Sequence, residues 1–168
     1  TAIRKIAEMK VDVPMLAMTH CDASKLAAQH GDKSEFALCA SQWHKTLTYK
    51  DKYFGDGMKY DADFTKAYGY APPYQAAESS AALLVFKDAF ERANSFDTKK
   101  VRDALAKTNM QTFYGNVKFG SGGQNVAKPM VLFQVMCKSG KCENVVVAPT
   151  KWAAAELIHP IPAWSKRK

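Results

Sequence analysis

Two adjacent prolines, Pro72 and Pro73, constrain the fold of this 168-residue chain more than any other feature of its sequence. Proline lacks the amide N–H that a helix interior needs, but its fixed φ suits a first turn, so we expect a helix to start here and to run to about Asn94. At 100° per residue, most of its apolar side chains share one broad arc, namely Ala82, Leu83, Val85, Phe86, Ala89, Phe90 and Ala93. The pattern predicts a long helix that covers a core.

The same arc, projected back toward the start of the helix, includes Glu78. A carboxylate among apolar side chains is costly unless something pairs with it, which makes Glu78 a candidate site residue. The alternative is a first-turn glutamate that is favoured by the helix macrodipole and tilts out to water. Both interpretations stay open.

Further helices and strands are expected on either side of this helix. Residues 58–68 predict a helix that Gly69 ends, and Ser95-Phe96-Asp97 caps a second helix after the long one. The motif FYG-x-V-x-F and the glycines that follow it predict a strand and a hairpin turn, and an apolar strand is expected from Pro129 to Val135. We expect residues 46–57 to form a loop.

Two apolar runs near the N-terminus, Val13 to Met18 and Glu35 to Ser41, predict buried strands of an α/β sheet. In open α/β sheets, ligands bind beyond the carboxyl ends of the strands. Thr19 and His20 follow the first run, so they are candidate ligand-binding residues at the mouth of a cleft. For His20 the alternative is a loop histidine satisfied by water.

Seven segments of the chain resemble a known family in the same order along the sequence: PPYQAA, AALL, AFERA, VRDAL, TFYGNVKF, GGQN and MVLFQV. They are similar to the C-terminal half of type I periplasmic solute-binding proteins, the branched-chain amino-acid and amide group that serves ABC importers. The resemblance implies an α/β fold of the three-layer sandwich kind, present here as part of a two-lobe protein. Residues 1–43 and 128–168 would belong to the C-terminal lobe, and residues 44–127 to the N-terminal lobe.

Neither lobe would then be complete. The chain opens inside an amphipathic helix and shows no signal peptide, which suggests that upstream chain is missing. The resemblance therefore implies either a truncated or cleaved product, or two copies that complete one another as an exchange dimer.

The resemblance also implies ligand-binding positions. Asp32 resembles an acid that faces the ligand ammonium in amino-acid-binding relatives. Trp43 follows a strand that leads into a crossover, where it would stack on a ligand or close over it; the alternative is a tryptophan buried for packing alone. Several relatives have a tyrosine at the position of Ser80, so this side of the site would be defined by Tyr74, Gln75 or Glu78.

The function implied is an extracytoplasmic, periplasmic solute-binding component of an ABC importer. It would capture a small amino acid, amide or aromatic acid in an interlobe cleft and dock on the membrane permease. One alternative is a ligand-sensing domain of the same fold in a regulatory system. Another is a fragment of an α/β enzyme whose catalytic residues lie elsewhere.

The four cysteines favour an oxidising compartment. Cys137 and Cys142 bracket a turn-forming tetrapeptide between two strand-like runs, so a disulfide across a hairpin is expected. Cys21 and Cys39 form a second candidate pair, with buried free thiols as the alternative.

Several classes of function lack their signatures. The formal charge of +8 is spread along the chain without a basic stripe, so no nucleic-acid partner is expected. The longest apolar run, AALLVF, is too short to span a bilayer. No nucleophile elbow, phosphate loop or dinucleotide fingerprint is present, and the histidines and cysteines lack metal-ligand spacing. We therefore expect neither an enzyme nor a cofactor.

Overall fold

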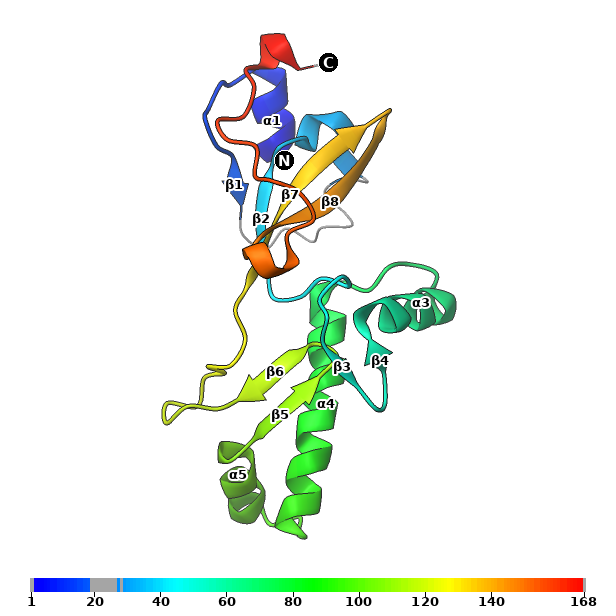
Figure 1. Cartoon of the computed structure of the whole chain (residues 1–168), viewed down its shortest axis with the longest axis vertical. Coiled ribbons are helices and arrows are strands. Elements are labelled where there is room, and N and C mark those ends of the chain that lie inside the picture. The colour runs from blue at the N-terminus through cyan, green and yellow to red at the C-terminus, as the bar shows by residue number, and fades with distance from the viewer. Residues whose placement is uncertain (1, 19–26, 28, 168) are drawn as a thin grey trace. The chain divides into compact units, whose positions relative to one another are not determined.

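The computed structural model describes residues 2–18, 27 and 29–167, and the contacts within the chain divide it into two compact units. Unit 1 comprises residues 1–41 and 131–168, and unit 2 comprises residues 42–130. The chain therefore passes from unit 1 into unit 2 and back again (Figure 1). The assignment of residues 1–43 and 128–168 to one lobe and of 44–127 to another stays a prediction.

Unit 1 is built on a four-stranded sheet with the strand order β1-β2-β7-β8. β1 (Ala17–Met18) is parallel to β2 (Leu38–Ser41), whereas β7 (Val131–Lys138) is antiparallel both to β2 and to β8 (Lys141–Ala148). Among the described residues of this unit, helix α1 (Ala2–Glu8) and three 3-10 helices accompany the sheet: η1 (Gly31–Ser34), η2 (Thr150–Trp152) and η3 (Trp164–Lys166). The sheet buries Leu38, Cys39, Val131, Phe133, Val135 and Val146.

The strands of unit 1 differ in length from the sequence-based expectation. β1 is shorter than the apolar run at 13–18, and β2 begins at Leu38 because Phe36 has a positive φ of 68° that interrupts the extended backbone. The segment after η2 is held on this unit, since Ile161 is buried and its N–H donates to the carbonyl of Pro14.

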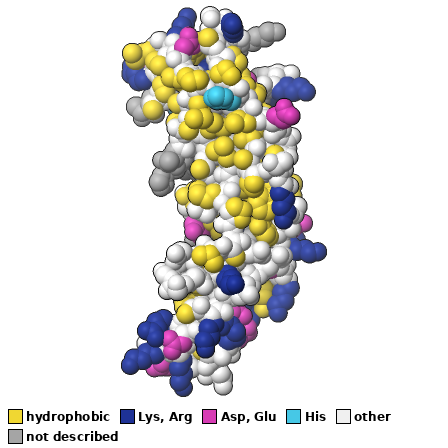
Figure 2. Space-filling model, turned by 60° about the vertical axis from the view of Figure 1, so that its left-hand side comes forward, with side chains coloured by type: hydrophobic (Ala, Val, Ile, Leu, Met, Phe, Trp, Pro, Cys, Tyr) yellow, Lys and Arg dark blue, Asp and Glu magenta, His cyan; other side chains and the backbone are white. Residues whose placement is uncertain are grey.

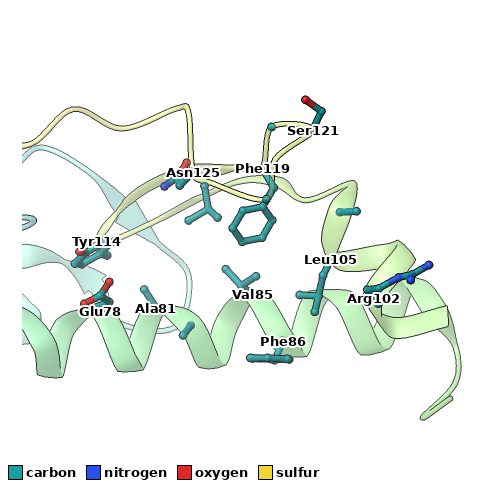
Figure 3. Close-up of a pocket in the computed structure, with 15 residues that line it drawn as sticks. Glu78, Ala81, Val85, Phe86, Arg102, Leu105, Tyr114, Phe119, Ser121 and Asn125 are labelled. Carbon is teal, nitrogen blue, oxygen red and sulfur yellow. The ribbon is translucent and has the colours of Figure 1, made fainter. Parts of the chain in front are cut away.

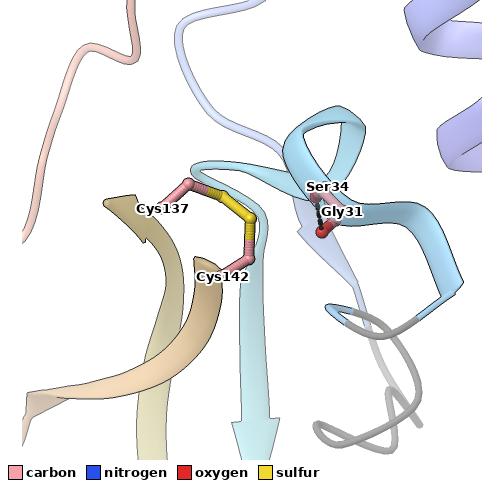
Figure 4. Close-up of a disulfide and its surroundings, with 4 residues drawn as sticks. All are labelled: Gly31, Ser34, Cys137 and Cys142. Atoms are coloured by element: carbon pink, nitrogen blue, oxygen red, sulfur yellow. Dashed lines mark hydrogen bonds between the residues drawn. A yellow bond between two sulfur atoms is a disulfide. The ribbon is translucent and has the colours of Figure 1, made fainter. Parts of the chain in front are cut away.

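Cys137 and Cys142 lie opposite each other on β7 and β8 and form a disulfide (Figure 4). Ser139 and Gly140 make the turn between the strands, and both have a positive φ. The bridge thus lies across a hairpin, as the bracketed turn indicated. Cys39 is also disulfide-bonded, while its predicted partner Cys21 lies outside the described residues.

Unit 2 consists of three helices and two small hairpins. The helices are α3 (Gly57–Tyr68), α4 (Tyr74–Ala93) and α5 (Thr98–Ala106). One hairpin pairs β3 (Lys50–Asp51) with β4 (Gly55–Asp56), and the other pairs β5 (Asn109–Thr112) with β6 (Gly115–Lys118).

The helix boundaries of unit 2 follow local chemistry. Pro73 precedes α4, and Asn94 ends it in the left-handed conformation. The Asp97 side chain accepts hydrogen bonds from the first amides of α5, and Gly69 ends α3 with a φ of 78°. These boundaries agree with the prediction from the sequence.

The FYG motif differs from its prediction. Phe113 and Tyr114 form the turn between β5 and β6 instead of lying within a strand, and Gly115 begins β6 with a φ of 150°. The glycine-rich segment after β6 does not lead into a neighbouring strand of unit 2. The strand that follows it is β7, which pairs within unit 1.

The side of α4 that is buried also differs from the prediction. The helix buries Ala77, Ala81, Leu84, Val85 and Ala89. Leu83, Phe86 and Phe90 were expected on the covered arc, but their exposed fractions are 66%, 47% and 37%. The prediction was wrong for these residues because α4 carries apolar side chains on most of its circumference, and packing rather than sequence selects which ones are covered.

Charged side chains of both signs gather over the end of unit 2 where α5 lies (Figure 2). Ion pairs join Lys87 to Glu91 and Arg92 to Asp88 on α4. Arg92 also donates to the carbonyl of Ala104 and thereby connects α4 to α5. This end therefore has the mixed charge that is typical of a solvated surface.

Candidate functional site

The predicted site residues of unit 1 are only partly described. Asp32 lies in the first turn of η1 and is exposed. Thr19 and His20 lie outside the described residues. Their roles in ligand binding stay predictions.

Trp43, the first predicted site residue of unit 2, lies in an aromatic core. It is 5% exposed. Its ring makes edge contacts with Tyr60 and Phe113, at centroid separations of 5.8 and 6.2 Å, and those two rings stack at 4.2 Å. Within unit 2, the Trp43 side chain is thus buried by packing against other aromatic rings, as in the alternative interpretation of this residue.

Tyr74, Gln75 and Glu78 lie together at the N-terminal end of α4. Tyr74 is half-buried, while Gln75 and Glu78 are exposed. Glu78 borders a cavity, and its carboxyl group lies beside Tyr114 (Figure 3). The exposure of Glu78 matches the interpretation in which this glutamate tilts out to water.

Lys128 completes this polar group, although no pattern in the sequence singles it out. Its Nζ atom donates a hydrogen bond to the carbonyl of Gln42 and lies 4.3 Å from the centroid of the Tyr114 ring. Within the described part of the chain, no carboxylate forms an ion pair with this ammonium. A half-buried cation is thus held by a carbonyl and a ring face alone.

The pKa values show that these groups influence one another. Burial lowers the pKa of Lys128 to about 8, and the nearby charge of Glu78 opposes this shift. Burial raises the pKa of the Tyr114 hydroxyl, and Glu78 and then Tyr74 raise it further. Tyr74, Glu78, Tyr114 and Lys128 therefore form one electrostatic cluster, which we call the α4 cluster.

Gly115 makes room for the lysine of the α4 cluster. Its φ of 150° disfavours other residues, and a Cβ at this position would overlap the Cδ atom of Lys128. Glycine is therefore favoured at this position of the FYG motif because the aliphatic stem of Lys128 passes close to the backbone here.

A cavity of ≈ 490 Å³ extends from the α4 cluster along α4 toward α5. Glu78 and Tyr114 lie at one end, while Val85, Leu105 and Phe119 line its middle (Figure 3). Arg102 lies at the opposite end and points away from it. The lining of the cavity is mostly apolar. Its polar side chains include Glu78 and Tyr114 of the α4 cluster and, nearer Phe119, Ser121 and Asn125.

Among the described residues, no group of three or more His, Cys, Asp and Glu side chains is arranged to hold a metal ion. The polar groups of the α4 cluster are donors, acceptors and ring faces. Such groups can hold a polar solute through hydrogen bonds.

Comparison with known proteins identifies the family. A model of the periplasmic binding protein family matches residues 1–141. The chain belongs to the periplasmic binding protein family. The resemblance seen in the sequence is thereby confirmed at the level of the family.

Solved structures of this family share the fold. A leucine-binding protein from Thermotoga maritima is 22% identical, with 89% of this chain and 43% of that chain covered and a TM-score of 0.63. A leucine-, isoleucine-, valine-, threonine- and alanine-binding protein from Brucella ovis, in a closed conformation, is 13% identical, with 95% and 43% covered and a TM-score of 0.70.

A third structure is a branched-chain amino acid transporter substrate-binding protein from Streptococcus pneumoniae in complex with isoleucine. It is 16% identical, with 86% of this chain and 40% of that chain covered and a TM-score of 0.63. The chain thus spans less than half the length of these binding proteins, and the likeness establishes the predicted α/β fold in partial form.

Proposed function

We propose that this chain is part of an extracytoplasmic solute-binding component of an ABC importer, and that the solute is a small amino acid, amide or aromatic acid. Membership of the periplasmic binding protein family supports this proposal. The three solved structures above are of amino-acid-binding proteins. The membrane permease is the proposed partner.

The α4 cluster is the observation on which the proposal depends. An amino acid carries a carboxylate and an ammonium group a few bonds apart, and the α4 cluster holds a cation, Lys128, and an anion, Glu78, that influence one another. Lys128 would bind the carboxylate, which would offset the cost of keeping its ammonium half-buried. Glu78 would accept from the ammonium or amide N–H of the solute, and Tyr74 and Gln75 would border it.

The extracytoplasmic location is supported by the cysteines. Cys137 and Cys142 are joined, and no described cysteine is a free thiol. Disulfides persist in oxidising compartments. No helix among the described residues is long and apolar enough to cross a membrane.

Thermal unfolding against a panel of amino acids, amides and aromatic acids tests the proposal. A solute at a hundred times its Kd stabilises the folded state by about 2.7 kcal/mol, so binding raises Tm measurably. The rise should be lost in Glu78→Gln and Lys128→Met, which preserve shape while removing charge. Lys66→Met, an exposed position in the last turn of α3, is the matched control and should keep the rise.

Two results would contradict the proposal. One is a panel in which no solute raises the Tm of the wild type. The other is a solute that is chemically converted during the measurement, since turnover identifies an enzyme.

A further inference from the structure

The carboxylate of Asp51 connects the two hairpins of unit 2. Asp51 is half-buried and lies on β3, immediately before the turn that leads into β4. Its Oδ1 atom accepts hydrogen bonds from the N–H groups of Tyr53 and Phe54, both at 2.8 Å. Its Oδ2 atom accepts from the N–H of Phe113 in the other hairpin, at 2.7 Å and across 62 residues of sequence. Both oxygens of this side chain thus accept from main-chain donors.

The turn that Asp51 reaches lacks the residues that usually form a two-residue hairpin turn. The favoured turns of this length have a positive φ at one or both central positions, which glycine and asparagine adopt readily. The central positions here are Phe113 and Tyr114, and neither has a positive φ. Contacts from outside the hairpin therefore matter for the conformation of this turn.

Asp51 supplies one such contact to the first residue of the turn. Phe113 is fully buried, and its ring stacks on that of Tyr60 with the centroids 4.2 Å apart. A buried main-chain N–H without a hydrogen-bond partner is costly, and a carboxylate is a strong acceptor for it. Phe113 is therefore held at two points, at its ring by the aromatic core and at its N–H group by Asp51.

Tyr114, the second residue of the turn, belongs to the α4 cluster. Because a single planar peptide bond joins it to Phe113, the hydrogen bond to Asp51 restricts where the Tyr114 ring can lie. The centroid of that ring is 4.3 Å from the Nζ atom of Lys128. A series of contacts thus leads from Asp51 through the turn to the lysine that would bind the solute carboxylate.

We propose that Asp51 is a positioning residue of the solute site, because its carboxylate fixes the turn at Phe113 and the turn holds the Tyr114 ring over the ammonium of Lys128. Asp51 acts on the solute through these residues and does not contact it. The proposal rests on the proposed function, which assigns the α4 cluster to solute binding. It adds to the site a residue of β3, from a segment that the sequence predicted as a loop.

Asp51→Asn breaks the contact with the turn selectively. The asparagine oxygen can still accept from the N–H groups of Tyr53 and Phe54, but the NH2 group that replaces Oδ2 cannot accept from Phe113. Asp51→Ser is a second variant in case the first does not fold. Its shorter side chain can accept within its own hairpin but is too short to reach the other one.

Two matched controls separate this contact from other effects. Asp56→Asn removes the same charge from β4 of the same hairpin, and asparagine caps α3 as well as aspartate does. Gln111→Met removes the other side-chain hydrogen bond between the hairpins, which runs from its Nε2 atom to the carbonyl of Lys50 at 2.9 Å. Neither control touches the turn at Phe113.

NMR of the full polypeptide that contains this chain, labelled with 13C-lysine and free of solute, reports where the Tyr114 ring lies. Protons over the face of an aromatic ring are displaced upfield by its ring current, so the Cε protons of Lys128 are sensitive to this ring. Lys128→Met identifies their signal by its absence. Tyr114→Leu gives the position of the signal without the ring.

In Asp51→Asn, we expect the Lys128 signal to lose most of its upfield displacement, while both controls keep it. Calorimetric titration with leucine, acetamide and benzoate, one solute of each proposed class, measures the consequence for binding. For whichever of these binds the wild type, we expect the Kd to rise about ten-fold in Asp51→Asn and to stay unchanged in the controls. Asp51→Ser should show the same two changes.

Three outcomes would overturn the proposal. One is a Lys128 signal that stays in place in Asp51→Asn and Asp51→Ser. Another is an equal displacement in Gln111→Met, which would assign the effect to any contact between the hairpins. The third is a displaced signal with an unchanged Kd. The NMR measurement contains no solute, so it tests Asp51 even if none of the three solutes binds the wild type, a result that would count against the proposed function instead.

Discussion

The ammonium of Lys128 lies 4.3 Å from the centroid of the Tyr114 ring, on the turn between β5 and β6. The same ammonium donates to the carbonyl of Gln42, which is 86 residues away in the sequence. Gln42 is the first residue of unit 2, and Lys128 lies close to its last, Met130. The Lys128 side chain therefore connects the start and the end of unit 2 to the turn between β5 and β6.

Replacement of Lys128 by methionine should change how stability depends on pH. Its pKa in the folded protein, about 8, is below that of lysine in an unfolded chain, so the unfolded chain binds more protons between these values. The free energy of unfolding should therefore increase as the pH rises from 8 to about 10. This added stability should be lost as the pH falls back through 8. Lys128→Met should lack this rise.

Urea unfolding at several pH values between 7 and 10 measures this difference. Lys66→Met serves as the control, because Lys66 is exposed on α3. All three proteins carry the same tyrosines, so the comparison isolates the lysine. Parallel pH profiles for wild type and Lys128→Met would contradict the assignment of a lowered pKa to this residue.

Gly115→Ala should destabilise the protein by about 2 kcal/mol or more, through both backbone strain and overlap with the Lys128 stem. Gly123→Ala is a matched control, since Gly123 also has a positive φ but its added Cβ would meet nothing within 4 Å. Chemical denaturation gives both values. The Lys128→Ala background should reduce the cost of Gly115→Ala to that of the control, and equal costs in both backgrounds would contradict the overlap.

The boundaries of the long helix were predictable, whereas its buried side was not. Pro73 and Asn94 determine where α4 begins and ends through backbone chemistry that acts within a few residues. Which side is covered depends on other segments, because Leu83 and Leu84 are equally apolar and only one of them is buried. A periodicity argument cannot separate two apolar sides of one helix.

Only the residues of the α4 cluster that lie on helix α4 could be predicted from the sequence. Glu78 attracts attention as an acid among apolar residues, but Lys128 lies in an irregular segment between β6 and β7, where no periodicity indicates which side chains are buried. Its contact with Gln42 is long-range, and the sequence feature that reflects its position is Gly115, where a Cβ would overlap the lysine stem. The FYG motif was misassigned to a strand because Phe113 and Tyr114 favour strands, although here they form a turn.

Removal of the hairpin disulfide should cost about 2 kcal/mol, because the bridge closes a short loop and constrains the unfolded chain modestly. The double variant Cys137→Ala/Cys142→Ala tests this by thermal unfolding. A reductant is unsuitable, since Cys39 is also disulfide-bonded and would be affected. Ser139→Ala, in the same turn, controls for local changes of sequence. An unchanged Tm in the double variant would show that the bridge does not stabilise the folded hairpin.

Gln134 should be among the most sensitive positions of unit 1, because its buried amide holds two other segments on β7. Its Nε2 donates to the carbonyls of Phe36 and Ile158, both at 3.1 Å, and its Oε1 accepts from the N–H of Ile158 at 2.9 Å. Gln134→Met preserves the volume but leaves these backbone groups without that partner. The expected cost is about 2–4 kcal/mol.

The loss should be largest in the C-terminal segment, since Ile158 is held by two of the three hydrogen bonds. Urea unfolding gives the free energy, and hydrogen exchange at Ile161 and Trp164 reports whether this segment detaches first. Gln124→Met, at an exposed position, is the matched control. If both glutamine variants lose the same small amount of stability and exchange at Ile161 is unchanged, the buried amide does not anchor the C-terminal segment.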